Sequence, residues 1–88
     1  MIAVNDARYD SEYKIWIEFN TGESGVADLS DLPHKFKAAI PLKSIDEFRQ
    51  FYLDDWPTLA WKCGFDLSPE SLYERVTGKR QDWMDNSI

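Results

Sequence analysis

The stretch "CGFDLSPESLYERV", residues 63–76, contains the start of a strongly specified helix. Ser68 is a favoured N-cap residue, and Pro69 is a favoured first helical residue. Glu70 places a negative charge at the helix N-terminus, where the helix dipole stabilises it. Leu67 and Leu72 have the spacing of a hydrophobic staple across the cap. The stretch therefore predicts a helix that begins at residue 69.

This helix is expected to end at Gly78, because glycine readily adopts the left-handed conformation that follows many helices. Leu72, Tyr73 and Val76 then form one apolar stripe. A helix of about two turns is too short to be stable alone in water. We therefore expect its stripe to pack on a sheet, and the preceding apolar residues supply candidate strands.

The segments just before the helix, "FYLDD" (51–55) and "TLAWK" (58–62), indicate two strands around an Asp-Asp-Trp-Pro turn. Farther upstream, "YKIWIEF" (13–19) shows the clearest alternation in the chain. One face of that strand carries Tyr13, Ile15, Ile17 and Phe19, and the other carries Lys14, Trp16 and Glu18. This pattern is typical of an antiparallel sheet with one buried face.

The remaining segments are less regular. Residues 2–9 predict a first strand, 20–25 a glycine-containing turn, and "VADLSDL" (26–32) a second hairpin strand with Val26 and Leu29 in the core. Residues 34–43 are ambiguous, because Pro41 limits any helix there to about two turns. Ser44 and Glu47 match a capping box, which predicts a helix over 45–50 that buries Ile45 and Phe48.

The predicted fold class is therefore α+β, with an antiparallel sheet of four to five strands and two short helices. We expect a single domain over residues 1–78 and a C-terminal tail over 79–88. The tail has no periodicity, and its Trp83 and Met84 could contact either the domain or a partner.

The charge balance bears on the partner. The chain carries 16 acidic and 10 basic residues, a net charge of −6. This charge disfavours direct nucleic-acid binding and favours a basic protein partner. No apolar run is long enough for a membrane span or a signal peptide, and Cys63 is the single cysteine. We therefore expect a cytoplasmic protein with a reduced thiol.

Several residues invite a chemical interpretation. Asp54, Asp55 and Asp66 could form a paired-carboxylate site, but neighbouring strand residues point to opposite faces, so a solvated turn is the favoured interpretation. Cys63 and His34 lack a catalytic signature and are too few for zinc. We expect no catalytic residue, no cofactor and no metal.

The tryptophans are the better candidates for binding. Exposed aromatic residues in an acidic protein can anchor an interface. The competing interpretation is that the domain's own helices cover the second sheet face. The candidate partner interface consists of Trp16, Glu18, Asp54, Asp55, Trp56 and Trp83.

The order of motifs resembles a known family. The motifs are "F-x-T-G" at 19–22, "GVADL" at 25–29, Phe48, "LDD" at 53–55, "LAW" at 59–61 and "G-x-D-L-x-P-E-x-L-Y" at 64–73. Together they resemble DUF2442, a small prokaryotic domain of unknown function. The resemblance implies no established enzymatic activity. It also implies relatives that carry a C-terminal helix-turn-helix, and others that form one half of two-gene modules.

We therefore expect a non-enzymatic protein-interaction or regulatory module, in the manner of an antitoxin. The sequence stops at Ile88, so we do not expect a DNA-binding segment to follow. One alternative is a small-molecule-binding or enzymatic domain that uses Asp54 and Asp66. Another is an acidic phage-derived inhibitor that mimics nucleic acid. The sequence leaves open whether the chain forms a homo-oligomer.

Overall fold

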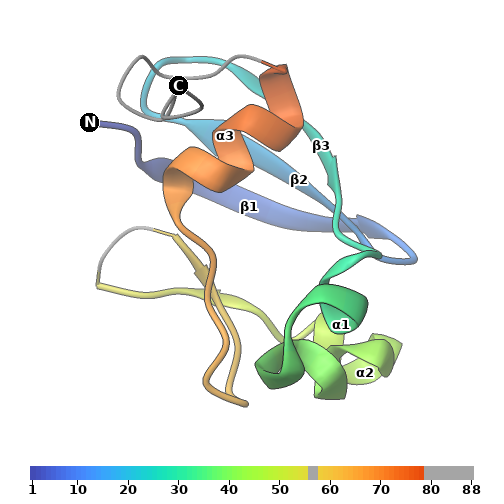
Figure 1. The fold of residues 1–88 in the computed structure, drawn as a ribbon. Coiled ribbons are helices and arrows are strands. Elements are labelled where there is room, and N and C mark those ends of the chain that lie inside the picture. Colours follow the sequence, from blue (N-terminus) through green and yellow to red (C-terminus); the bar gives the residue numbers. More distant parts are fainter. Residues whose placement is uncertain (56–57, 79–88) are drawn as a thin grey trace, which may run out of the picture.

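The described part of the chain forms an α+β domain with two antiparallel sheets. The computed structural model describes residues 1–55 and 58–78. Its first sheet has the order β1-β2-β3, and its second pairs β4 with β5. The elements, shown in Figure 1, are β1 (Val4–Ser11), β2 (Lys14–Phe19), β3 (Ser24–Asp28), α1 (Leu32–Lys35), the 3-10 helix η1 (Lys37–Lys43), α2 (Ile45–Phe48), β4 (Tyr52–Leu53), β5 (Leu59–Ala60) and α3 (Pro69–Thr77). The predicted fold class is confirmed, with the strands divided between two sheets.

Helix α3 begins and ends where the sequence predicts. The backbone N–H of Ser71 donates to Ser68 Oγ at 3.1 Å. At the other end, Gly78 adopts φ 75° and its N–H donates to the Glu74 carbonyl at 2.8 Å. Leu67 and Leu72 are both buried across the cap. The two ends are therefore fixed by local hydrogen bonds, and packing supplies the rest of the stability.

Helix α3 crosses one face of the three-stranded sheet (Figure 1). The Tyr73 ring meets the Phe19 ring edge to face, with 5.2 Å between centroids. Gly25 allows the close approach of helix and strand, because a Cβ atom there would lie 2.8 Å from Val76 Cγ1. The helix thus closes the core over β2 and β3.

No helix of the described residues is long and apolar enough to cross a membrane.

The β4–β5 hairpin and the turn after it bring Trp61 into the centre of the core. Trp61 is 2% exposed, and its Nε1–H donates to the Phe48 carbonyl at 2.8 Å. Its ring lies 5.9 Å from the rings of both Phe48 and Phe65. Gly64, at φ 98°, turns the chain back so that the Leu67 N–H reaches the Leu59 carbonyl. Residues 65–67, which run back beside β5, lead directly into α3. The position of the helix start is therefore set by this pairing as well as by the Ser68 cap.

The prediction for the third strand is wrong at Val26, which is 45% exposed, whereas Leu29 is buried as expected. Val26 pairs with Trp16, so it lies on the face opposite the core. Ala27, which pairs with Ile15, takes the buried position. The predicted strand over 2–9 is observed two residues later, and β-bulges interrupt its register on both sides of the segment 6–9.

The helix predicted over residues 45–50 is shorter in the structure, where α2 spans Ile45–Phe48. Ser44 caps α2 by accepting from the Glu47 N–H at 3.5 Å, but the Ser44 N–H donates to the Pro41 carbonyl, so the capping box is only half formed. The helix stops at Phe48, which is buried, and the prediction of a buried Ile45 is wrong because it is 37% exposed. The ambiguous segment 34–43 forms the end of α1 and then η1.

Candidate interaction surface

The face of the three-stranded sheet opposite the core is the first candidate surface. The pairing register places one row across all three strands, with Arg8 opposite Trp16 and Trp16 opposite Val26. The described helices pack on the other side of the sheet. We call this surface the outer sheet face; it consists of Asp6, Arg8, Lys14, Trp16, Glu18, Ser24, Val26 and Asp28.

Trp16 lies at the centre of this face and is partly buried. The Arg8 guanidinium sits 5.7 Å from the centre of the Trp16 ring, within cation–π range. Arg8 Nε also lies 3.3 Å from Asp6 Oδ2, and the Arg8 side chain is 74% exposed. An ion pair this exposed contributes little stability, so Arg8 can leave the ring at small cost. The face therefore offers a large aromatic ring under a movable cation.

Each edge of this sheet carries a contact that disfavours pairing with another strand. The Ala7 N–H donates to its neighbour Asp6 Oδ1 at 2.8 Å, between the two bulges of β1. On the β3 edge, the Asp28 carbonyl accepts from Arg75 at 3.1 Å. Bulges, charges and covered edges are the features by which proteins prevent edge pairing. Recognition is therefore expected across the face of the sheet and not by strand addition.

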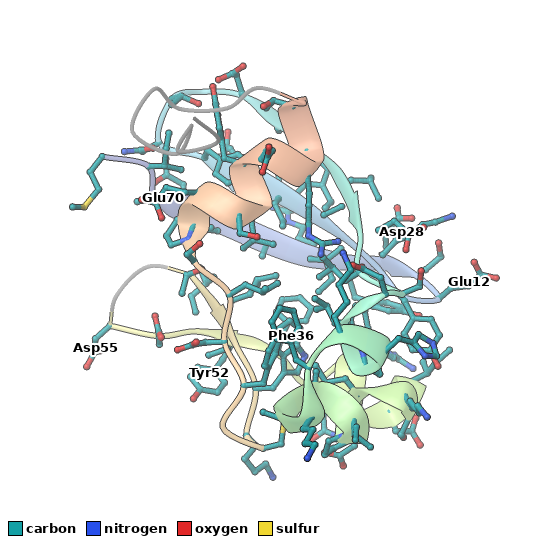
Figure 2. The ribbon with its side chains drawn as sticks, in the orientation of Figure 1. Glu12, Asp28, Phe36, Tyr52, Asp55 and Glu70 are labelled. Carbon is teal, nitrogen blue, oxygen red and sulfur yellow. The ribbon has the colours of Figure 1, made fainter. Side chains whose placement is uncertain are left out.

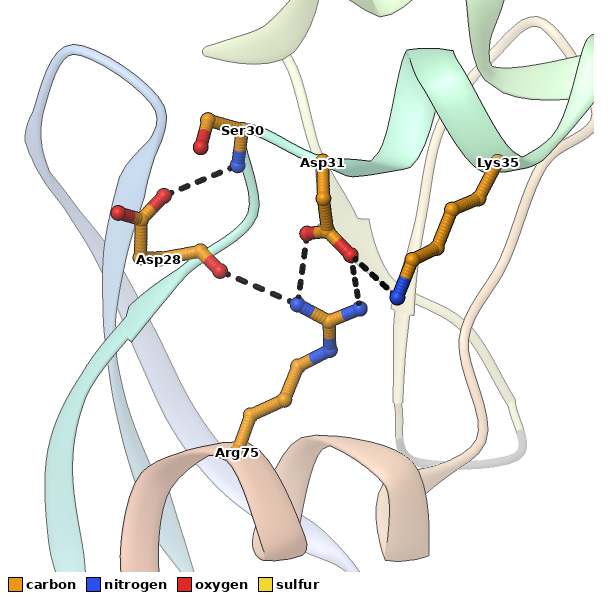
Figure 3. A network of polar contacts seen from close by, with 5 residues as sticks. All are labelled: Asp28, Ser30, Asp31, Lys35 and Arg75. Carbon is orange, nitrogen blue, oxygen red and sulfur yellow. Dashed lines mark hydrogen bonds and ion pairs between the residues drawn. The ribbon is translucent and has the colours of Figure 1, made fainter.

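A network of polar side chains fixes α3 to the end of the sheet and to α1 (Figure 3). Arg75 donates to both carboxylate oxygens of Asp31, and Lys35 Nζ lies 3.1 Å from Asp31 Oδ2. The Arg75 hydrogen bonds hold the pKa of Asp31 far below its ordinary value, and Asp31 in turn raises the pKa of Arg75. Nearby, the Ser30 N–H hydrogen bond lowers the pKa of Asp28.

The second candidate surface is a hollow of about 250 Å³ beside the start of α3. The structure brings Asp54 and Asp66 together there, as the sequence suggested, whereas Asp55 does not line it. The lining consists of Asp54, Thr58, Asp66, Leu67, Ser68, Pro69 and Glu70. Asp54 Oδ1 is buried and accepts no hydrogen bond from the residues that the structure describes. Three carboxylates around one hollow suit a positively charged group.

The predicted interface residues therefore fall on two elements of the fold. Trp16 and Glu18 lie on the outer sheet face. Asp54 and Asp55 follow β4 in the hairpin, and Figure 2 shows Asp55 on the same side of the molecule as Glu70, away from Asp28. The predicted interface residues Trp56 and Trp83 lie outside the described residues.

Sequence reasoning missed Arg8 and Val26 as members of the Trp16 row. For Arg8, the only signal was the loose alternation in residues 2–9, and the two bulges in β1 obscured it.

The other candidates from the sequence, His34 and Cys63, lie on different segments of the fold. His34 lies in α1, and the exposed Cys63 thiol donates to the Ala38 carbonyl at 3.4 Å. Within residues 1–55 and 58–78, no group of three or more His, Cys, Asp or Glu side chains is placed to hold a metal ion.

The fold and its surfaces define a small α+β domain whose helices and second sheet cover one side of a three-stranded sheet. The model of the family described as "Protein of unknown function (DUF2442)" matches residues 4–78. The chain belongs to this family, which confirms the resemblance seen in the sequence motifs.

A solved structure shares the fold. It is the "Crystal Structure of Putative DNA Binding Protein NE0471 from Nitrosomonas europaea ATCC 19718", with a TM-score of 0.76 and 18% sequence identity. The match covers 99% of this chain and 61% of that one, so this chain spans less than two thirds of that protein. At this identity the likeness shows the fold alone. A comparison with curated proteins finds no match.

Proposed function

We propose that this chain is a non-enzymatic module that binds another small protein in the cytoplasm, in the manner of the antitoxin member of a two-gene pair. The observation that supports it is the row formed by Arg8, Trp16 and Val26, which the described helices leave uncovered. Tryptophan and arginine are the residues most enriched among those that dominate binding energy. A ring already held in place loses little conformational freedom when a partner covers it.

The size of the outer sheet face indicates how it binds. Six strand residues extend about 20 Å, and three strands are about 14 Å wide. The projected area of the face is therefore about 280 Å², well below the roughly 800 Å² that each partner buries in a standard stable interface. The contact must extend onto neighbouring segments or be transient. A regulatory module that is exchanged between states fits the second case.

The expected partner is a basic protein, because the chain carries a net charge of −6. The name of the N. europaea protein refers to DNA, but the same charge repels a phosphate backbone at long range. Mimicry of nucleic acid by an acidic inhibitor is also less favoured. On the outer sheet face, Arg8 and Lys14 interrupt the carboxylates, whereas mimicry needs an uninterrupted acidic face.

A small-molecule or enzymatic role is the second candidate, and the hollow beside α3 favours it. Asp54 and Asp66 line this hollow together, and Asp54 Oδ1 is buried with no hydrogen-bond partner among residues 1–55 and 58–78. A small cationic ligand would fit such a site. The hollow of about 250 Å³ is nevertheless smaller than the ~300–1,000 Å³ of typical ligand pockets, so protein binding stays the favoured function.

Affinity capture from the native host tests the proposed function. Tagged wild-type protein is compared with Trp16→Ser and with Tyr52→Ser, a control at a 50% exposed aromatic residue on β4. We expect one small protein to be retained by wild type and by Tyr52→Ser, and at least tenfold less by Trp16→Ser. Circular dichroism confirms that each variant is folded. Equal retention by Trp16→Ser, or no specific retention by wild type, would contradict the proposal.

A further inference from the structure

Helix η1 presents a stripe of alternating charge and apolar surface. A 3-10 helix has three residues per turn, so side chains at i and i+3 eclipse one another. In η1, one such row buries Ala39 and Leu42 in the core. Another row aligns Lys37, Ile40 and Lys43, which are all exposed. We call this row the η1 stripe. It extends about 12 Å, given a rise of about 2 Å per residue.

The apolar part of this surface is held rigid. Ile40 is 49% exposed, and Phe36, directly before η1, is 45% exposed. The Phe36 ring lies 5.4 Å from the ring of the buried Phe65, so one side of Phe36 is anchored while the other faces solvent. Figure 2 shows Phe36 beside the α1 segment, whereas Glu12 lies at the β1–β2 turn and Asp28 at the end of β3. A preorganised apolar contact of this kind costs little entropy on binding.

The charge around the stripe is the reverse of the charge of the chain. The segment 32–45 contains three lysines and no acidic residue, although the net charge of the chain is −6. Lys35 is paired with Asp31. Among the described residues, neither Lys37 nor Lys43 forms an ion pair. The next acidic side chains, Asp46 and Glu47, follow in α2. Within the described part of the chain, two lysines without an ion-pair partner therefore flank an exposed isoleucine.

We propose that the η1 stripe, together with Phe36, binds an acidic peptide segment of a partner protein that inserts an apolar side chain between Lys37 and Lys43. Charge complementarity and size select this occupant. Attachment to an anionic membrane takes clusters of about four to eight basic residues. Nucleic-acid binders commonly neutralise about six to ten phosphates. Two lysines spaced about 12 Å apart fit a short peptide of four or five extended residues.

This binding surface is distinct from the outer sheet face, and its charge preference is opposite. The outer sheet face lies across β1, β2 and β3, whereas the stripe lies on η1 in the helical layer. A module with both surfaces could contact a basic protein and an acidic segment at the same time. The proposal for the stripe does not depend on the proposed function, because each surface is tested with its own variants.

Fluorescence anisotropy with defined peptides tests the proposal on the full chain. The probes are labelled ten-residue peptides that alternate Glu and Leu, Gln and Leu, or Lys and Leu. At about 150 mM salt, where charges more than about 8 Å apart are largely screened, we expect the Glu peptide to bind at least tenfold tighter than the Gln peptide. The Lys peptide, which the net charge of −6 attracts to other faces, should not lose affinity in Lys37→Glu/Lys43→Glu. The double variant Lys37→Glu/Lys43→Glu should lose at least tenfold in affinity for the Glu peptide.

Matched controls separate the stripe from general charge. The variant Arg8→Glu/Lys14→Glu changes the net charge by the same amount as Lys37→Glu/Lys43→Glu, but on the outer sheet face. Its affinity for the Glu peptide should stay within about twofold of wild type. Ile40→Ser should weaken binding, whereas Val26→Ser, at a similarly exposed residue, should not. Melting temperatures within about 4 °C of wild type confirm that these surface variants fold.

Four results would overturn the proposal: no binding of the Glu peptide, equal binding of the Gln peptide, an equal loss in the Arg8→Glu/Lys14→Glu control, or unchanged binding by Ile40→Ser. Phosphatidylserine vesicles and a twelve-nucleotide single-stranded DNA are tested in parallel. Tighter binding of either one, lost in Lys37→Glu/Lys43→Glu, would assign the stripe to lipid or nucleic acid and reject the peptide.

Discussion

Arg75 of α3 holds Asp31, the residue that precedes α1, through two parallel hydrogen bonds of 2.8 and 2.9 Å. The two residues lie 44 positions apart in the sequence. The same guanidinium donates to the Asp28 carbonyl at the end of β3. One side chain thus joins the end of β3, the covering helix α3 and the start of α1.

Arg75→Ala should therefore lower the free energy of unfolding by about 1–2 kcal/mol. This is the usual contribution of a charge-assisted hydrogen-bonded pair, reduced because the pair is partly exposed to solvent. For a domain of this size, that change lowers the melting temperature by roughly 5–12 °C. Arg8→Ala is the control, because its ion pair with Asp6 is largely exposed and should contribute less than about 0.5 kcal/mol. Urea unfolding at pH 7 measures the loss of stability in both variants. Equal losses would show that the bidentate contact contributes no more than an exposed ion pair.

The same pair predicts a pH dependence of stability. Arg75 depresses the pKa of Asp31 in the folded state below its ordinary 3.8. A group with a depressed folded pKa stabilises the protein above the unfolded pKa, and this contribution is lost as pH falls through the folded pKa. Asp31→Asn should therefore be less stable than wild type at pH 7, and the difference should shrink steadily from about pH 4 toward pH 2. A constant difference across this range, measured by urea unfolding, would contradict the assignment.

Gly25 supplies the close approach of β3 and α3. Gly25→Ala should destabilise the domain by about 1–3 kcal/mol, because the new Cβ would meet Val76 Cγ1 at 2.8 Å and a valine on a helix has little rotamer freedom. Val76→Ala should recover part of this loss in the double variant. Gly22→Ala is the control: its cost comes from a φ of 91° with open space around it, so Val76→Ala should not rescue it. Additive effects of Gly25→Ala and Val76→Ala would rule out the steric explanation.

The parts of the fold that the sequence predicts best are those with local causes. The α3 cap at Ser68, its end at Gly78 and the alternation of β2 all depend on residues within one turn or one strand. Each was found where expected.

What the sequence does not predict depends on register between distant segments. The apolar side chain of Val26 predicts a core position, but its pairing with Trp16 turns it outward. The η1 stripe depends on a 3-10 helix that continues through Pro41, where sequence patterns favour a helix end. The row across the outer sheet face depends on two bulges in β1 that leave no mark in the sequence.

Trp61 connects the hairpin to the helical layer through its indole N–H, which donates to the Phe48 carbonyl. Trp61→Phe should cost about 2–4 kcal/mol, because it leaves a buried carbonyl without a donor and a cavity where the larger ring stood. Phe36→Leu is the control from the same aromatic cluster; Phe36 is 45% exposed and should cost less than about 1 kcal/mol. Thermal unfolding compares the two, and a similar cost for both would mean that the hydrogen bond contributes little.

Association with a basic partner should slow as salt rises, because the net charge of −6 steers an oppositely charged protein at long range. Between about 50 and 300 mM salt, the association rate constant should fall several-fold while the dissociation rate constant changes little, as screening shortens the range of the attraction. Surface plasmon resonance with the captured partner measures both constants. The variant Asp54→Asn/Asp55→Asn should flatten the salt dependence, and Trp16→Ser should instead speed dissociation at every salt concentration. A salt-independent association rate would exclude electrostatic steering, and an unchanged dissociation rate in Trp16→Ser would exclude the outer sheet face as the contact.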